Sequence, residues 1–404
     1  MTVAVLGAGL QGCCTALALA ERGIDVVLFE RAGAVLSRTA IANEGKIHLG
    51  WMYAADPSLA TARTMMRGAL AFAPFLERYL GIEAARLPTS IPAAYVVHRD
   101  SQHSVAEVGA YFAATHDLLR AASAARPHAY FGRDVAAPVR RWSDAELDAA
   151  FDPGHVAAVF DTPEVAIDPV DLARRLGAVI ATHPRIEVRL GHEVTAADDG
   201  SVTTVAEGRT RREPFATIVN ALWESRLAID ATAGIGAGRP WLYRLKYGVG
   251  FKWPVGLPRP PSATIVSGPF GEVVSYPDAT TYLTWYPSCV TEMSSEMQPP
   301  YWPASPEGAA GRSMVAGTVD GLAAIVRALA PIRGAELDGQ WIKGGPIVAW
   351  GNTDIDDPRS ELHNRYDIGV HSQGSYHSID PGKLTMAPLF AEVCASRIAQ
   401  GGGQ

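Results

Sequence analysis

Residues 2–12 of the chain read Thr2-Val3-Ala4-Val5-Leu6-Gly7-Ala8-Gly9-Leu10-Gln11-Gly12. The apolar run predicts a buried strand, and the glycines after it have the G-x-G-x-x-G spacing of a tight turn into a helix. Residues 13–22, rich in Ala and Leu, predict that helix, and residues 25–30 predict a second buried strand. This order of strand, glycine turn, helix and strand is typical of a βαβ unit.

Each glycine of this turn has a physical task. Gly7 allows the tight turn, Gly9 lets a pyrophosphate approach the backbone, and Gly12 lets helix and strand pack closely. The helix N-terminus offers free N–H groups to the phosphates. Glu30 ends the second strand 18 positions beyond Gly12, where a carboxylate can accept hydrogen bonds from an adenosine ribose and would repel a 2′-phosphate. The stretch therefore predicts dinucleotide binding and disfavours NADP, without separating FAD from NAD.

The bulk composition is that of a globular protein. The 404 residues, 48% of them hydrophobic, are sufficient for two or three domains or for one large α/β unit with an inserted subdomain. A net charge of −7, with no basic cluster interleaved with aromatics, gives no reason to expect nucleic-acid or anionic-membrane binding. The chain has no apolar run of the roughly 18 residues that would predict a membrane span.

The cysteines and the N-terminal sequence indicate the cellular compartment of the protein. The four cysteines (Cys13, Cys14, Cys289 and Cys394) are too few and too scattered for a disulfide framework or a metal site, so no metal is expected. The chain enters a strand at once, without a basic region or a cleavage site. We therefore expect a cytoplasmic protein with reduced thiols.

A second informative stretch reads Asn43-Glu44-Gly45-Lys46-Ile47-His48-Leu49-Gly50-Trp51-Met52-Tyr53. Its glycines bracket an alternation of apolar and polar residues, which suggests backbone that runs close to a planar ligand. Asn43 and His48 could then present hydrogen-bond donors to that ligand. From the pattern alone, a strand with a half-buried histidine is the alternative.

Together these stretches resemble the flavoproteins of the D-amino-acid oxidase (DAO) superfamily. There a glycine fingerprint and a ribose-binding acid are followed by a segment N-x-G-x-I-H-x-G under the flavin, which Asn43, Gly45, Ile47, His48 and Gly50 match one for one. This version is similar to the L-2-hydroxyglutarate and glycerol-3-phosphate dehydrogenases. The resemblance implies FAD as cofactor and an α/β fold, in which a Rossmann-like FAD-binding domain of the glutathione-reductase type is interleaved with an α+β substrate domain built on an antiparallel sheet.

Later segments extend the resemblance over the chain. Asp168-Pro169 matches an acid-Pro pair that heads a helix, with the acid as N-cap and the proline at the first helical position. Residues 215–221 resemble a family strand that ends in Asn-Ala and closes over the cofactor. Gly382-Lys383-Leu384-Thr385 matches the Gly-Lys-Leu-Thr of glycerol-3-phosphate dehydrogenases, where a helix entry faces the N1–C2=O edge of the flavin.

The resemblance implies a division of the chain and a set of cofactor contacts. The FAD-binding domain would comprise residues 1–50, 161–235 and 345–404, and the substrate domain residues 51–160 and 236–344. The implied cofactor contacts are Gly7, Gly9, Leu10, Gln11, Gly12, Glu30, Arg31, Asn43, Gly45, Lys46, Ile47, His48, Val194, Asn220, Ala221, Gly374, Ser375, Gly382, Lys383, Leu384 and Thr385.

The implied function is that of an FAD-dependent oxidoreductase, which oxidises a CH–OH or CH–NH group of a small polar substrate by hydride transfer to flavin N5. An alcohol donor requires a base, and His48 is the first candidate because the ordinary pKa of histidine lies near neutrality. Several homologous subgroups instead attach FAD covalently through a histidine in this area, so both roles stay open. His371 and His377 are second-line candidates. The alternatives are an amino acid or amine oxidase without a protein base, and a flavin-binding partner subunit without turnover of its own.

The sequence differs from those of the two named dehydrogenases at the element that binds the anionic group of their substrates. Those enzymes carry a Gly-x-Arg-Pro element before the C-terminal strands, whereas this chain has Trp341-Ile342-Lys343-Gly344-Gly345-Pro346 and no arginine. Lys343 is the point charge at that place and, with His48 and His377, one of three candidate catalytic residues. Because a lysine lacks the bidentate geometry of arginine, we expect a different substrate. Lys46, Arg244 and Lys252 are further candidates for contact with a substrate anion.

Residues 242–287 predict β runs separated by turns, which suit an antiparallel sheet in the substrate domain. Tyr247, Lys252 and Trp285 lie on these runs and are candidate substrate contacts. Oxygen or a soluble electron acceptor is the expected oxidant, because no basic amphipathic helix favours access to a membrane quinone.

Overall fold

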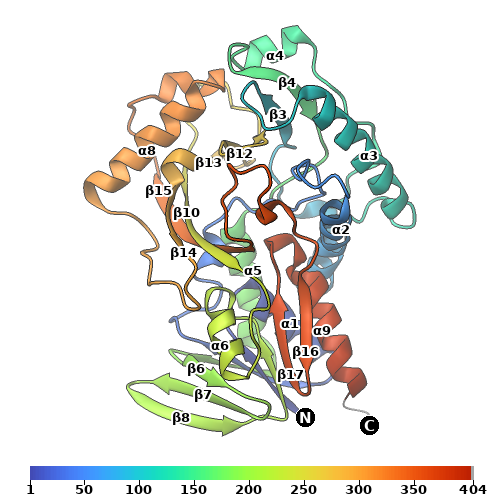
Figure 1. The fold of residues 1–404 in the computed structure, drawn as a ribbon, viewed down its shortest axis with the longest axis vertical. Helices are drawn as coiled ribbons and strands as arrows, with labels where there is room; N and C mark the ends of the chain where they lie inside the picture. Colours follow the sequence, from blue (N-terminus) through green and yellow to red (C-terminus); the bar gives the residue numbers. More distant parts are fainter. Residues whose placement is uncertain (402–404) are drawn as a thin grey trace.

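A six-stranded sheet carries the glycine turn in the computed structural model, which describes residues 1–401 (Figure 1). β1 pairs in parallel with β2 and β9, and β16 and β17 form an antiparallel hairpin at one edge. In spatial order the strands are β16 (Gly369–Gln373), β17 (Tyr376–Asp380), β9 (Thr217–Asn220), β1 (Thr2–Leu6), β2 (Asp25–Glu30) and β5 (Ile186–Leu190). The predicted βαβ opening is therefore present at the centre of this sheet.

Helices cover this sheet. The helix of the βαβ unit, α1 (Leu10–Glu21), is buried from Leu10 to Ala20, as expected for a segment that is apolar on all sides, and it packs against α9 (Ala387–Gly401). α5 (Pro169–Thr182) begins as predicted, because the side chain of Asp168 accepts a hydrogen bond of 2.8 Å from the N–H of Val170. α2 (Ala60–Leu80) and α6 (Arg226–Thr232) complete this part.

A larger, mostly antiparallel sheet lies beside the first (Figure 1). β11 and β3 are its parallel pair, and β15 joins it by pairing with β10 along ten residues. The strands are β14 (Val290–Ser294), β10 (Trp241–Lys252), β13 (Thr280–Trp285), β12 (Gly271–Ser275), β11 (Ala263–Val266), β3 (Ala94–His98), β4 (Val156–Asp161) and β15 (Trp341–Trp350). Its helices are α3 (Val105–Ser123), α4 (Asp144–Ala150), α7 (Tyr286–Cys289) and α8 (Gly308–Ala323). The predicted fold class, α/β with both parallel and antiparallel sheets, is confirmed.

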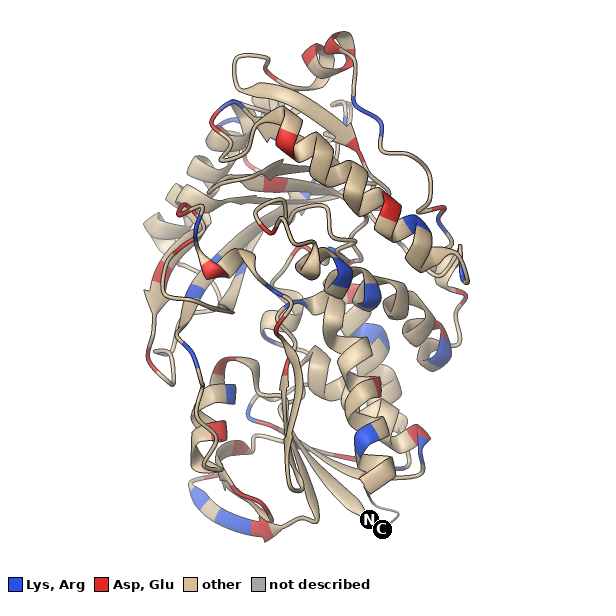
Figure 2. Ribbon diagram, turned by 45° about the vertical axis from the view of Figure 1, so that its right-hand side comes forward, with Lys and Arg blue, Asp and Glu red and all other residues tan. Residues whose placement is uncertain are grey.

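A small sheet of β6 (Glu193–Ala197), β7 (Ser201–Ala206) and β8 (Arg209–Pro214) extends from the end of the molecule at the bottom of Figure 1. Arg209, Arg211 and Arg212 lie exposed on its edge strand β8, which Figure 2 shows as a basic run. Charged side chains on an edge strand oppose pairing with another chain.

The division into two domains stays a prediction. Strands of the six-stranded sheet fall within 1–50, 161–235 and 345–404, and most strands of the larger sheet fall within 51–160 and 236–344. Two strands cross the predicted boundaries, since β4 ends at Asp161 and β15 runs from Trp341 to Trp350. Across residues 1–401, no helix combines the length and the apolar character needed to span a membrane.

Leu17 provides a test of the packing around α1. Its side chain is fully buried in the core between the sheet and the helices. Leu17→Ala should lower the free energy of unfolding by about 2–5 kcal/mol, because it removes buried methyl groups and leaves a cavity. Val255→Ala, at a fully exposed position, should change it by less than about 0.5 kcal/mol. Urea denaturation followed by circular dichroism measures both, and equal effects would contradict this packing.

Candidate functional site

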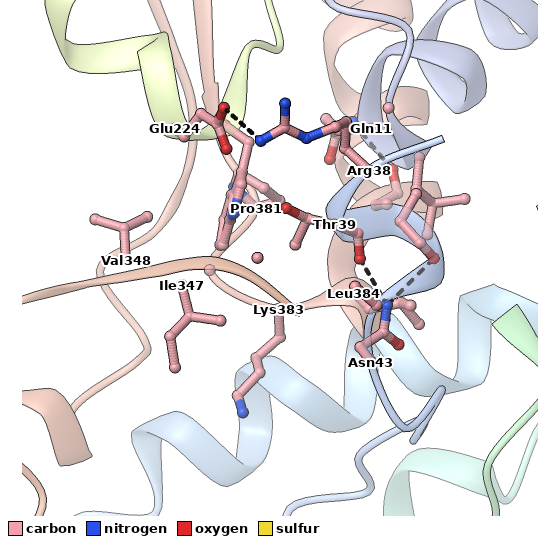
Figure 3. A pocket seen from close by; sticks show the side chains of 18 of the residues that line it. Gln11, Arg38, Thr39, Asn43, Glu224, Ile347, Val348, Pro381, Lys383 and Leu384 are labelled. Carbon is pink, nitrogen blue, oxygen red and sulfur yellow. Dashed lines mark hydrogen bonds and ion pairs between the residues drawn. The ribbon is translucent and has the colours of Figure 1, made fainter. Parts of the chain in front are cut away.

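A single cavity joins the glycine turn to the histidine segment. It encloses about 300 Å³, at the lower end of the range of about 300–1,000 Å³ typical of ligand sites. Its wall comes from the turn between β1 and α1, the end of β2, residues 37–53, β10, β15 and the loop before α9. Figure 3 shows side chains from these elements converging on it, with Ile347 and Val348 on one side and Gln11 and Arg38 on another. The topology thus brings together stretches that are far apart in the sequence.

Glu30 and Gly7 shape the nucleotide end of this cavity. The carboxylate of Glu30 accepts hydrogen bonds from the N–H groups of Ala8 (3.0 Å) and Ala32 (2.9 Å). Gly7 has a φ of +90°, a conformation that other residues rarely adopt. The acid at the end of β2 therefore faces the glycine turn, as the sequence predicts.

The turn also tests whether a dinucleotide fits. A Cβ atom at Gly9 would meet nothing within 4 Å, and Gly9 borders the cavity, so its backbone is open to a ligand. A Cβ atom at Gly12 would lie 1.8 Å from the carbonyl oxygen of Gly7, so Gly12 serves the packing of helix on strand. No side chain caps the start of α1, where Leu10 and Gln11 line the cavity. These features fit a pyrophosphate held by backbone N–H groups.

Two arginines meet one carboxylate at the same end. Arg31 pairs with Glu224. Nη2 of Arg38 lies 3.8 Å from the same carboxylate. Figure 3 shows the side chains of Arg38 and Glu224 on the cavity wall. All three residues line the cavity.

His48 lies on the cavity wall with a buried carboxylate behind it. Its Nδ1 is 3.3 Å from Oε1 of Glu164, close enough for an ion pair but outside hydrogen-bond geometry. Glu164 is fully buried and accepts hydrogen bonds from the N–H of Leu49 (2.6 Å) and the hydroxyl of Tyr95 (2.5 Å). The N–H of His48 itself donates to the hydroxyl of Thr385 (2.9 Å). A hydrogen bond therefore holds the backbone of His48, and its imidazole lies against the carboxylate of Glu164.

The two groups shift each other's pKa. Burial lowers the pKa of His48, the carboxylate of Glu164 opposes this, and the charges of Lys383 and Lys46 add to the lowering. Burial raises the pKa of Glu164. The lowering effects of the neighbouring groups are larger and hold this pKa below its ordinary value; they come from the charge and the contact of His48, the charge of Lys46 and the hydrogen bond from Tyr95. The lowered pKa of His48 favours a neutral imidazole at neutral pH, and Lys46 and the hydroxyl of Tyr95 then still favour the ionised form of Glu164.

A buried network of charges lies against the larger sheet. Nζ of Lys46 is 2.5 Å from Glu272 and also contacts the hydroxyl of Thr264. Nζ of Lys246 is 3.4 Å from Glu272 and 3.5 Å from Glu44. Both lysines line the cavity, yet each is already paired with a carboxylate.

The structure brings most of the predicted cofactor contacts to the cavity. Those in its lining are Gly7, Gly9, Leu10, Gln11, Glu30, Arg31, Asn43, Lys46, His48, Val194, Ala221, Gly382, Lys383 and Leu384. Those outside its lining are Gly12, Gly45, Ile47, Asn220, Gly374, Ser375 and Thr385.

The residues outside the lining have other contacts. A Cβ atom at Gly45 would lie 1.8 Å from the carbonyl oxygen of Ile167, so the glycine allows two backbone segments to pack closely. The side-chain amide of Asn220 donates to Asp230 (2.8 Å). Ser375 lies beside Gly374 at the tip of the β16–β17 hairpin. Its N–H and its hydroxyl donate hydrogen bonds to the carboxylate of Asp199.

Two of the three predicted catalytic residues lie away from the cavity. His377 is on β17, with Nδ1 2.8 Å from the hydroxyl of Ser372. Lys343 is on β15, with Nζ 4.7 Å from the ring centroid of Trp341. Neither lines the cavity, so His48 is the candidate that the structure brings to it.

The predicted substrate contacts also lie outside the lining. The hydroxyl of Tyr247 donates to the carbonyl of Pro303 (2.8 Å), and the exposed Lys252 pairs with Asp278 (2.7 Å). Trp285 packs against Gly321, and the next residue, Tyr286, lines the cavity instead. β13 ends at Trp285 and α7 begins at Tyr286, so the chain turns between these two residues.

Sequence reasoning gave no role to Glu164, Tyr53 or Arg365. Glu164 begins the apolar run 164–167, where an acid indicates a buried charge. Because a buried charge needs partners, this position could have marked a functional contact. Tyr53 stood at the end of the histidine stretch, and Arg365 lies in an irregular segment with no pattern.

Comparison with known proteins gives the family. The DAO family, described as FAD dependent oxidoreductase, matches residues 2–259. The fold is similar to glycine oxidase from Geobacillus kaustophilus, with 15% identity over 99% of this chain and 94% of that chain and a TM-score of 0.67. It is similar to L-alpha-glycerophosphate oxidase from Mycoplasma pneumoniae (18% identity, 99% and 95% covered, TM-score 0.64). It is also similar to L-proline dehydrogenase from P. horikoshii (15% identity, 99% and 93% covered, TM-score 0.66).

The two glycines of the turn separate ligand binding from packing. Gly9→Ala should weaken FAD binding about tenfold or more, about 1.4 kcal/mol, because its methyl group occupies the approach to the backbone. Gly12→Ala should instead lower the stability at saturating FAD by about 1–3 kcal/mol, because its methyl group collides with the carbonyl of Gly7. Fluorescence titration with FAD and thermal unfolding measure the two effects. Unchanged FAD affinity in Gly9→Ala would contradict this assignment.

Proposed function

The chain belongs to the DAO family of FAD-dependent oxidoreductases, and from that premise we propose that it oxidises a CH–OH group of a small polar substrate, with His48 as the base. The observation that carries the proposal is the buried His48 on the cavity wall, with the carboxylate of Glu164 3.3 Å from its Nδ1. When bound, FAD supplies the acceptor for the two electrons and the hydrogen of the substrate C–H bond.

His48 accepts the hydroxyl proton as the C–H bond breaks. A neutral imidazole is available because burial holds the pKa of His48 below its ordinary value. With Nδ1 directed at Glu164, Nε2 is the nitrogen left for the substrate. The carboxylate then stabilises the imidazolium that forms, and its bonds to Leu49 and Tyr95 keep it in place.

We assign the cofactor to the cavity residues that the sequence predicts. The backbone at Gly7 and Gly9 and the start of α1 would hold the pyrophosphate, and Glu30 would accept hydrogen bonds from the ribose. Lys383 and Leu384, on the loop before α9, would contact the flavin end. Oxygen or a soluble acceptor would reoxidise the flavin.

Oxidation of a CH–NH group is the second candidate. Glycine oxidase and L-proline dehydrogenase, whose folds are similar, are named for amino acid substrates. A neutral amine carries no proton that a base must remove, so this reaction does not need His48. The two candidates therefore predict different effects of the same substitution.

The test is anaerobic reduction of the bound flavin by short 2-hydroxy acids and by the matching 2-amino acids. His48→Asn should slow reduction by the hydroxy acid about 10²- to 10⁴-fold, because the base is lost, while the FAD content stays that of the wild type. His377→Asn is the matched control, since His377 lies outside the cavity, and it should reduce at the wild-type rate. Reduction by amino acids alone, at equal rates in wild type and His48→Asn, would contradict the proposal.

The pH dependence of kcat/KM tests the role of Glu164 as a positioning residue. In the wild type, kcat/KM should rise with pH through the pKa of His48, which lies below its ordinary value. Glu164→Gln removes the charge that raises this pKa, so the rise should move to still lower pH while the plateau falls. The FAD content controls for misfolding. A pH profile that stays in place would assign Glu164 a structural role only.

A further inference from the structure

Arg31, Arg38 and Glu224 form a bridge of side chains at the nucleotide end of the cavity, and these three residues are called the strap. We propose that the strap closes over bound FAD and has to open before FAD enters or leaves. The inference rests on the proposed FAD site, but it concerns the exchange of the cofactor and is independent of the substrate that is oxidised.

The sheet topology places the strap beside the glycine turn. β9, β1 and β2 are parallel neighbours, so their carboxyl ends lie at the same edge of the sheet. Arg31 follows directly after β2, Glu224 comes shortly after β9, and the glycine turn follows β1, which lies between those two strands. The ion pair of Arg31 and Glu224 therefore connects the segments on the two sides of the turn. It lies across the edge of the sheet at which the pyrophosphate would bind.

The contacts of the strap join side chains that water reaches only in part. Nη2 of Arg38 lies 3.8 Å from the carboxylate that pairs with Arg31, so Glu224 serves both arginines. The side chain of Glu224 is 13% exposed, and water therefore screens its charge less than at an open surface. Because the contacts involve side chains alone, they can open by rotamer changes while β2 and β9 stay paired with β1.

The residue before Glu224 directs it toward the cavity. Trp223 has a φ of +54°, a left-handed conformation that a bulky residue rarely adopts. Its indole N–H donates a hydrogen bond of 2.7 Å to the carbonyl of Pro346 on β15. Strained backbone persists only where surrounding contacts hold it, and it recurs at ligand clamps. The conformation of Trp223 is therefore an observation independent of the ion pair, and it supports the same role.

The charges of the strap suit a pyrophosphate. Two guanidinium groups share one carboxylate, so the strap keeps a net positive charge. The carboxylate of Glu30, at the same end of the cavity, already accepts hydrogen bonds from the N–H groups of Ala8 and Ala32. Guanidinium groups pair favourably with phosphate oxygens. The closed strap therefore attracts the anionic cofactor that it covers.

A gate differs from an ordinary cofactor contact in its effect on the rates of exchange. Loss of a contact speeds the release of FAD and leaves its entry unchanged, so the Kd rises by the same factor as the release rate. Loss of a gate lowers the barrier in both directions. Entry and release then become faster together, and the Kd changes little.

The test measures both rate constants from the flavin fluorescence, with entry followed after mixing apoprotein with FAD and release followed after dilution of the holoprotein. Glu224→Gln keeps the size of the side chain and removes its charge, so it should speed both entry and release about five- to tenfold. The Kd should change by less than about threefold. Glu83→Gln is the matched control, because it removes a carboxylate from the exposed ion pair with Arg86 outside the cavity, and it should exchange FAD as the wild type does.

Faster release with unchanged entry in Glu224→Gln would make Glu224 an ordinary contact and overturn the inference. Unchanged or slower exchange would also overturn it. Glu224→Ala repeats the test if Glu224→Gln does not bind FAD. Gly9→Ala separates the strap from the proposed FAD site: unchanged FAD affinity in Gly9→Ala removes the site. Weakened affinity in Gly9→Ala, together with wild-type exchange rates in Glu224→Gln, removes the strap alone.

Discussion

A fully buried carboxylate holds the reactive part of the site together. Glu164 accepts hydrogen bonds from Leu49 in the histidine segment and from Tyr95 on β3, and it lies against His48. A buried carboxylate without partners costs several kcal/mol, so both elements are held in place around it. The same contacts that stabilise the charge of Glu164 also fix the imidazole at the cavity wall. Glu164 therefore links the histidine segment to β3 at the cavity wall.

The nucleotide half could be predicted because its chemistry is local. The φ of +90° at Gly7 requires a glycine whatever the rest of the chain does, and the Asp168 cap depends only on the helix that it starts. The position of Glu30 could be predicted because the lengths of the strands and the helix in the βαβ unit place this acid opposite the glycine turn. The antiparallel sheet was also evident from alternating runs between turns.

The substrate half could not be predicted because its side chains meet only in the tertiary fold. Whether Trp285 or Tyr286 faces the cavity depends on where β13 ends and α7 begins, which the sequence pattern does not fix to one residue. Arg365 lies in an irregular segment that only the tertiary fold brings to the cavity. Gly374, which resembled a cofactor contact, lies at a hairpin tip instead. A glycine in the sequence does not by itself distinguish a ligand contact from an ordinary turn.

The central claim is that His48 is a free base beside noncovalent FAD. The four cysteines are buried outside the cavity, whereas His48, the tether candidate that the family resemblance suggests, lines it. The most direct measurement is the visible absorption spectrum of the soluble and pelleted fractions after acid precipitation of the purified protein. The account predicts that the flavin spectrum is released into the supernatant. Flavin colour retained in the pellet would show that FAD is covalently attached and would contradict this claim.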